Sequence, residues 1–116
     1  MEQDCARPVV HWEIQARDPG RLREFYRQMF NWEIGDAPIM QIGPAVGAPE
    51  VITGHILPAE RSRVVLYIQV LDLGASMERA KTLGGAVTRE PIHIPGGATI
   101  AGIADPEENA IVLVQQ

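Results

Sequence analysis

The sequence has one cysteine and no long apolar run, and each shortage excludes a class of protein. Cys5 cannot form a disulfide within the chain, and we interpret it as an exposed thiol on a loose N-terminal arm. No apolar segment has the length of a membrane span, and residues 1–8 lack the basic and apolar build of a signal peptide. We therefore expect a cytoplasmic protein.

Basic residues are also scarce. The chain has 10 Lys and Arg against 15 Asp and Glu, which gives a formal net charge of −5. A negative chain is repelled by nucleic acid and by anionic membranes, so neither is an expected partner. The 116 residues suffice for one core, and 46% hydrophobic with 22% charged residues is ordinary for a globular protein. The composition predicts a single globular domain over residues 1–116.

The segment from residue 9 to residue 30 predicts a strand followed by an amphipathic helix. One face of the strand carries His11, Glu13 and Gln15 and points to water or to a polar cavity, while the other face is apolar. Asp18 is the expected N-cap, with Pro at the first helical position. The spacing then predicts a buried helix stripe formed by Leu22, Phe25, Tyr26, Met29 and Phe30.

Residues 31–57 read as short strands around a connection rich in Gly and Pro. We expect strands at 31–35, 39–42 and 51–57. Gly54 indicates a bulge or the close approach of another group. Met40 and Ile42 border the connection and are candidates for a lid over a binding site.

The opening plan then returns. A strand at 64–70, a cap at Asp72 and a helix at 75–83 are followed by strands at 86–94, 98–104 and 110–115. A shift of 54 residues superposes Asp18 on Asp72. We interpret this as a duplication: module one covers about 8–57, a connector 58–63, and module two about 64–115. The predicted fold class is α+β, with tandem βαβββ modules forming a mixed sheet.

Over residues 8–115 the chain resembles the vicinal-oxygen-chelate superfamily, which includes glyoxalase I, extradiol dioxygenases and bleomycin-resistance proteins. The segments that carry the resemblance are HWEIQARDPGRLREFYRQMFNWEI, TLGGAVTREP and the closing ADPEENAIVLVQ. The resemblance implies a cupped sheet with the helices on its outer face, and often a homodimer whose modules complete each cup. In the family's metalloenzymes, one divalent ion in the cup chelates two neighbouring oxygens of the substrate.

The resemblance carries only part of that metal site over to this chain. His11 matches the family's first-strand histidine, whereas the positions of two other ligands fall on Val65 and Val112, which have no donor atom. The remaining carboxylate is expected near Thr53, where the sequence has no acid. Since a stable site needs three or more donors, the expected cofactor is either none or a divalent metal (Ni, Zn, Mn or Fe).

Several polar residues are candidates for a site in the cup. His11 and Glu13 are the candidate catalytic residues, and aligning 51–57 with the final strand directs His55 toward them, so His11 and His55 are the candidate metal ligands. The candidate ligand-binding residues are Gln15, His55, Tyr67 and Gln69. Each has a structural alternative: a solvated strand for Glu13, a core or interface position for Tyr67, and no role for His93.

Three functions remain open at this point. The first is a metal-free binder of a small organic molecule in the cup of a homodimer, in the manner of bleomycin-resistance proteins. The second is a lyase, isomerase or dioxygenase-type enzyme that uses His11, with or without a metal, on a small carbonyl or vicinal-oxygen substrate. The third is an interaction module without a ligand. The fold hosts many chemistries, so the site must decide between them.

Overall fold

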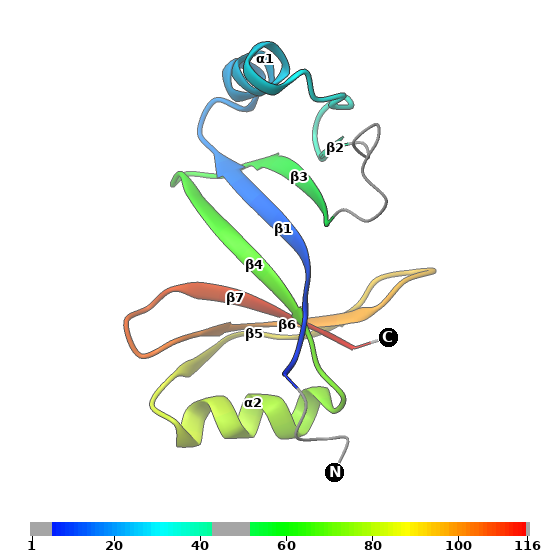
Figure 1. The fold of residues 1–116 in the computed structure, drawn as a ribbon. Coiled ribbons are helices and arrows are strands. Elements are labelled where there is room, and N and C mark those ends of the chain that lie inside the picture. The colour runs from blue at the N-terminus through cyan, green and yellow to red at the C-terminus, as the bar shows by residue number, and fades with distance from the viewer. Residues whose placement is uncertain (1–5, 43–51, 116) are drawn as a thin grey trace. The chain divides into compact units, whose positions relative to one another are not determined.

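The computed structural model describes residues 6–42 and 52–115. Its helices and strands are β1 (Val9–Ala16), α1 (Pro19–Phe30), β2 (Met40–Ile42), β3 (Thr53–Pro58), β4 (Arg63–Gln69), α2 (Leu73–Thr82), β5 (Ala86–His93), β6 (Thr99–Ala104) and β7 (Ala110–Gln115) (Figure 1). The strands pair in the order β2-β3-β1-β4-β7-β6-β5. The pairs β1–β3 and β4–β7 are parallel, whereas β2–β3, β5–β6 and β6–β7 are antiparallel. The predicted α+β fold with a mixed sheet is confirmed.

Contacts between Cα atoms divide the chain into two compact units. The first unit is residues 11–65, and the second combines residues 1–10 with 66–116. The second unit's elements follow the predicted order of strand, helix and three strands. In the first unit, the strand expected at 31–35 is reduced to one isolated bridge between Ile34 and Ile42. The module limits of 8–57 and 64–115 stay a prediction.

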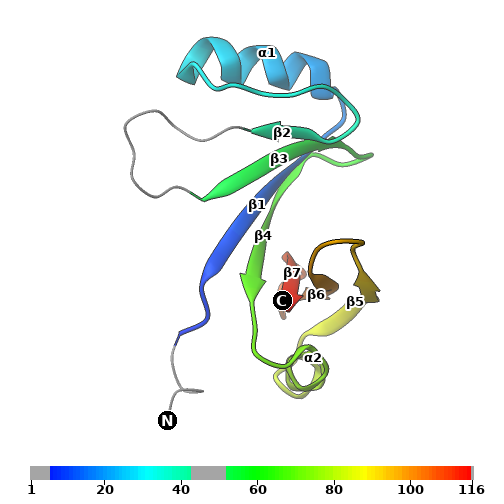
Figure 2. The ribbon, with the colours of Figure 1, turned by 90° about the vertical axis from the view of Figure 1, so that its right-hand side faces the viewer.

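In the first unit, α1 covers one face of the short strands (Figure 2). Asp18 caps the helix as predicted, because its Oδ1 accepts a hydrogen bond from the backbone N–H of Arg21 at 3.2 Å. Leu22 and Tyr26 pack against the core of this unit. The buried residues of that core are Ile14, Ala16, Ile34, Met40, Ile42 and Ile56.

The predicted helix stripe is wrong for three of its five residues. Phe25, Met29 and Phe30 have exposed fractions of 53%, 58% and 52%. The helix has a narrow surface to cover, because it contacts β3 and the neighbouring strand β2 has only three residues. The helix is held instead by ring contacts at its edge, where Tyr26 stacks on Trp32 with 5.2 Å between centroids.

The predicted lid is also wrong. Met40 and Ile42 are only 6% and 8% exposed and belong to the core, because alternate residues of β2 point under the helix. The connection they were expected to border lies mostly at residues 43–51, outside the described residues, as does Cys5.

In the second unit, α2 packs on β5, β6 and β7. Asp72 caps it as predicted, by accepting a hydrogen bond from the backbone N–H of Ala75 at 2.9 Å. Leu73 and Met77 are its buried residues and share a cluster with Val70, Ala101 and Leu113. Neither this helix nor α1, the two that the described residues form, is long and apolar enough to cross a membrane.

Candidate active site

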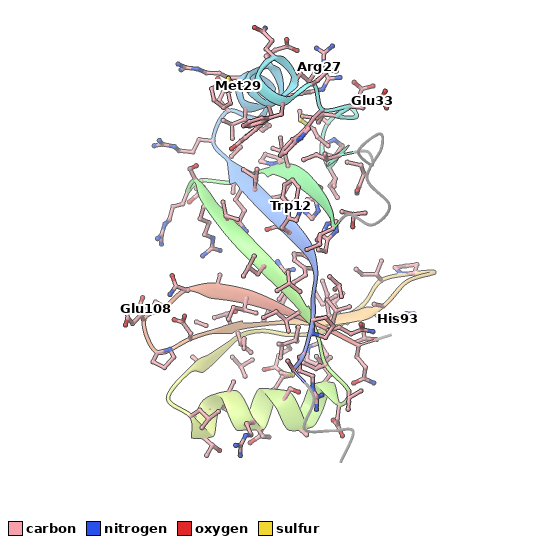
Figure 3. The ribbon with its side chains drawn as sticks, in the orientation of Figure 1. Trp12, Arg27, Met29, Glu33, His93 and Glu108 are labelled. Atoms are coloured by element: carbon pink, nitrogen blue, oxygen red, sulfur yellow. The ribbon has the colours of Figure 1, made fainter. Side chains whose placement is uncertain are left out.

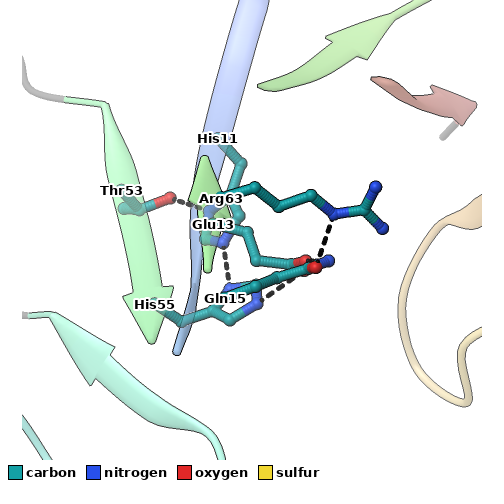
Figure 4. A network of polar contacts seen from close by, with 6 residues as sticks. All are labelled: His11, Glu13, Gln15, Thr53, His55 and Arg63. Atoms are coloured by element: carbon teal, nitrogen blue, oxygen red, sulfur yellow. Dashed lines mark hydrogen bonds and ion pairs between the residues drawn. The ribbon is translucent and has the colours of Figure 1, made fainter. Parts of the chain in front are cut away.

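The polar face of β1 meets β3 in the first unit. The two strands are parallel, and their register places His11 opposite Thr53 and Glu13 opposite His55. Because side chains opposite one another in a sheet share a face, these four lie together on the face that α1 does not cover. Figure 4 shows the resulting network, to which Gln15 of β1 and Arg63 of β4 also contribute.

A tight contact on the opposite face holds the two strands close. Trp12 lies opposite Gly54, and a Cβ atom on Gly54 would come within 2.3 Å of the indole ring. The indole Nε1–H also donates a hydrogen bond to the carbonyl of Ile52 at 3.2 Å. The close approach expected at Gly54 is therefore the Trp12 ring. It fixes β3 against β1 directly beside His55.

Five hydrogen bonds join the six polar side chains into one continuous network, called the polar chain below (Figure 4). Thr53 Oγ1 lies 2.7 Å from His11 Nδ1, and His11 Nε2 lies 2.7 Å from His55 Nδ1. His55 Nε2 lies 3.0 Å from Glu13 Oε1. On the other side of the carboxylate, Gln15 Nε2 lies 2.6 Å from Glu13 Oε2, and Arg63 Nε lies 2.6 Å from Gln15 Oε1.

The arginine and the carboxylate set the direction of three bonds in this network. The Nε–H of Arg63 can only donate, so it requires the oxygen of the Gln15 amide, and the amide nitrogen then donates to Glu13. An ionised Glu13 can only accept, so His55 donates to it from Nε2.

The donor and acceptor nitrogens of the two imidazoles follow from the hydrogen bond that His55 donates to Glu13. With His55 neutral, its Nδ1 accepts a hydrogen bond from the Nε2–H of His11. The Nδ1 of His11 then accepts from the hydroxyl of Thr53. All five bonds therefore point toward Glu13, and His11 and His55 are both Nε2–H tautomers.

The middle of the polar chain is buried, and the residues at its two ends are exposed. Glu13 and His55 are 5% and 7% exposed, whereas Thr53 and Arg63 are exposed residues. Burial lowers the pKa of His11 below its ordinary value of 6.5, and the neighbouring His55 lowers it further, against an opposing effect of Glu13. His11 is therefore a neutral base at neutral pH.

The polar chain can accept one proton at His11 without a large rearrangement of its side chains. If His11 takes a proton on Nδ1, it can pass the proton on Nε2 to His55 across 2.7 Å. His55 then carries the positive charge directly beside the carboxylate of Glu13, 3.0 Å away. A buried cation is tolerated only next to such a partner. The arrangement supports proton transfer at the His11 end.

The donors present do not fit the divalent ion that the resemblance implies. His11 Nε2 and His55 Nδ1 face each other, but Glu13 meets His55 on the opposite ring nitrogen. One ion can therefore reach two of these donors and not the third, which is fewer than a stable site needs. Within residues 6–42 and 52–115, no group of three or more His, Cys, Asp and Glu residues could hold a metal ion.

The remaining candidate residues belong to the second unit. The structure brings together His11, Glu13, Gln15 and His55, while Tyr67 and Gln69 belong to the second unit, where they lie opposite Val112 and Val114 of β7. His93 is exposed at the end of β5, with Nδ1 3.2 Å from the hydroxyl of Thr99 (Figure 3).

Sequence reasoning did not assign Thr53 and Arg63 to the site. Thr53 carried a signal that could have been used, because it shares the alternating face of His55. For Arg63 the signal was absent, since an arginine after a polar connector is usually only solvated.

Comparison with known proteins agrees with this architecture. The glyoxalase-like domain model matches residues 11–114. No curated protein sequence matches the chain. Among solved structures, the Mn(II)-bound glyoxalase from Novosphingobium aromaticivorans superposes with a TM-score of 0.68 at 19% identity, over 95% of this chain and 40% of that one. The chain thus spans less than half of that glyoxalase.

Two further structures match along most of both chains. Methylmalonyl-CoA epimerase from Mycobacterium tuberculosis has a TM-score of 0.61 at 17% identity, covering 92% of this chain and 86% of its own. A glyoxalase/bleomycin resistance protein/dioxygenase superfamily member from Vibrio splendidus 12B01 has a TM-score of 0.68 at 13% identity, covering 96% and 100%. At these identities the structures show the fold alone, whereas the family model covers most of the chain. The protein belongs to the glyoxalase-like family of the vicinal-oxygen-chelate superfamily.

Proposed function

We propose that the protein is an acid–base enzyme of the isomerase or lyase type that removes a proton next to the carbonyl group of a small organic molecule without a metal. The single observation that carries this proposal is the hydrogen-bonded chain from Thr53 through His11 and His55 to the buried Glu13. A base positioned by a second group and a third is the arrangement that proton abstraction requires.

The proposed reaction begins when the substrate displaces the Thr53 hydroxyl from His11. The hydroxyl turns to donate to the carbonyl oxygen of the substrate, and His11 Nδ1 takes the proton from the neighbouring carbon. The electron pair of the broken C–H bond forms the enolate, while the proton on His11 Nε2 passes to His55. Return of the proton to the same or to another carbon completes an isomerisation, and loss of a leaving group completes an elimination.

The second candidate is the metal-free binder. The observation that favours it is that the Thr53 hydroxyl covers His11 Nδ1 at 2.7 Å, so that the ring nitrogen is saturated until a ligand displaces the hydroxyl. In a binder, Thr53 and His11 would only orient a polar group of the ligand. The absence of donor atoms at Val65 and Val112 is consistent with both candidates.

Deuterium exchange distinguishes the two. We expect simple ketones incubated with the protein in D₂O and a chelator to lose the α-proton signal in ¹H NMR faster than in buffer. His11→Ala should abolish the acceleration, while His93→Ala, which removes an exposed histidine, should retain it. Ligand binding by the wild type with no exchange of any ketone would favour the binder.

A titration with metal tests the inferred misfit of the donor set. Calorimetry of stripped protein with Ni(II), Zn(II), Mn(II) and Fe(II) should show no stoichiometric binding at tens of micromolar, because the cluster offers two donors to one ion. Stoichiometric binding that His11→Ala abolishes would contradict a metal-free mechanism.

A homodimer is part of the proposal. Its support is the outer side of α1, where Phe25, Met29 and Phe30 are each about half exposed (Figure 3 labels Met29). Apolar side chains grouped in this way are typical of surfaces that contact another molecule. Sedimentation velocity should give a dimer for the wild type and a monomer for Met29→Lys, and a monomeric wild type would refute it.

A further inference from the structure

One end of the polar chain is an arginine, and hydrogen bonds to the other polar side chains fix the position of its guanidinium group. Arg63 extends from β4, and its Nε–H donates to Gln15 Oε1 at 2.6 Å (Figure 4). Gln15 is held in turn, because its Nε2 donates to the buried Glu13 at 2.6 Å. Two short hydrogen bonds thus connect an exposed guanidinium to a buried carboxylate.

This connection leaves the outer part of the guanidinium available. In the part of the chain that the structure describes, no hydrogen bond or ion pair involves the Nη1 or Nη2 groups of Arg63. Because the Nε–H is already committed to Gln15, the plane of the guanidinium is set before any ligand arrives. An oriented pair of N–H groups is suited to a carboxylate, which it can bind with two parallel hydrogen bonds.

The charges of the network favour such a ligand. Glu13 and Arg63 are its only groups that are charged when both histidines are neutral, and they are separated by the neutral amide of Gln15. The positive charge is therefore exposed at the surface while the negative charge is buried. A carboxylate can therefore bind the guanidinium of Arg63 while the hydrogen bonds within the network stay in place.

We propose that Arg63 binds the carboxylate of the ligand, so that the substrate is an oxo acid rather than a neutral carbonyl compound; the assignment of a substrate rests on the proposed function. Gln15 and His11 are four residues apart on β1, about 13 Å between Cα atoms at the rise of a strand. A carboxylate at Arg63 and a carbonyl at His11 therefore belong to an extended molecule, with several carbons between the two groups.

Binding without turnover tests the arginine separately from the chemistry. Octanoate has the carboxylate but no carbonyl, and octan-1-ol has neither, so their affinities can be compared by calorimetry on the full chain. We expect octanoate to bind about tenfold or more tightly than the alcohol and to shift the ¹⁵Nε signal of Arg63. Arg63→Gln should remove the preference, Arg63→Lys should restore it only in part, and Arg61→Gln in the adjacent turn should leave it unchanged.

Two results of the binding experiment would overturn the proposal. One is an Arg63 signal that octanoate leaves unmoved up to about 10 mM, and the other is an unchanged preference for octanoate in Arg63→Gln. Deuterium exchange of 7-oxooctanoate and of octan-2-one then separates this proposal from the proposed function. Exchange of both ketones at equal rates would keep the base and reject the arginine, whereas octanoate binding at Arg63 without any exchange would keep the arginine and reject the base.

Discussion

Two strands of this chain lead through an aspartate cap into a helix, and they carry different chemistry. The shift of 54 residues that relates β1 to β4 replaces His11 by Val65 and Glu13 by Tyr67. Val65 is 2% exposed and contributes to the packing, whereas Glu13, at 5%, is a buried carboxylate. Burying a carboxylate costs stability unless hydrogen bonds replace its water.

The comparison shows what allows a strand in this fold to bury a carboxylate. β1 can bury an acid because its neighbour β3 supplies His55 in register and because Gln15 reaches back along the same strand. No such donors are required by the apolar side chain of Val65. The buried acid of β1 therefore depends on its neighbours, and the predictions below test the difference between the two strands.

The largest effect is expected from the base. His11→Ala should slow α-proton exchange of a reactive ketone by about 10²- to 10⁴-fold, the usual contribution of one acid–base group. Its matched control is His93→Ala, because His93 is exposed in the second unit and its ring hydrogen-bonds to the hydroxyl of Thr99. NMR exchange rates measure both. Equal losses in the two variants would show that His11 has no special part in the reaction.

The buried acid should dominate the stability of β1. Glu13→Ala leaves the Nε2–H groups of His55 and Gln15 without their acceptor, and we expect a loss of roughly 2–4 kcal/mol in the free energy of unfolding. Glu13→Gln keeps one acceptor oxygen and should cost less. Urea denaturation gives both values, with Tyr67→Phe at the equivalent position of β4 as the comparison. A Glu13→Ala variant as stable as the wild type would mean that the network does not support the fold.

His11 of the first unit should make the free energy of unfolding depend on pH. The folded chain lowers the pKa of His11 below 6.5, chiefly by burial, so the unfolded chain binds the proton more readily. The contribution of His11 is therefore complete above pH 6.5 and is lost as the pH falls from there toward the lowered pKa. Urea titrations at pH 7.5 and at lower pH should show a smaller loss in His11→Asn than in the wild type or in His93→Asn.

The sequence predicted the elements better than the packing. The Asp18 and Asp72 caps and the strand limits of the second unit follow from local rules, since a cap and a turn need only neighbouring residues. The exposure of Phe25 and Met29 depends on how wide a surface the strands offer, and β3, the strand that α1 contacts, is distant in sequence. A helical period shows which residues share a face but not how much of that face is covered.

Some residues of the candidate site could also be predicted from the sequence, and others could not. Alternation on β1 already placed His11, Glu13 and Gln15 together. Aligning residues 51–57 with the final strand directed His55 toward them, and the structure places it beside both His11 and Glu13. The position of Thr53 depends on the parallel pairing of β3 with β1. Arg63 could not be found from sequence, because its role depends on a side-chain bond to Gln15 across two strands.

The smallest effect is expected in the second unit, at the turn between β6 and β7 (Figure 3). Glu108 has φ of +70°, a left-handed backbone that costs a residue with a Cβ about 1 kcal/mol or more. The turn is nevertheless formed, since Asp105 accepts hydrogen bonds from the backbone N–H groups of Glu107 and Asn109, each at 2.9 Å.

Glu108→Gly should therefore relieve the backbone without removing any of these bonds, and raise the free energy of unfolding by about 0.5–1 kcal/mol. Gly84, with φ of +97°, is the opposite test, because Gly84→Ala introduces a Cβ into the same region of φ and should destabilise. Neither change touches the polar chain, so exchange rates at His11 should stay the same in both. A Glu108→Gly variant that is less stable than the wild type would show that the Glu108 side chain contributes more to this turn than its backbone costs.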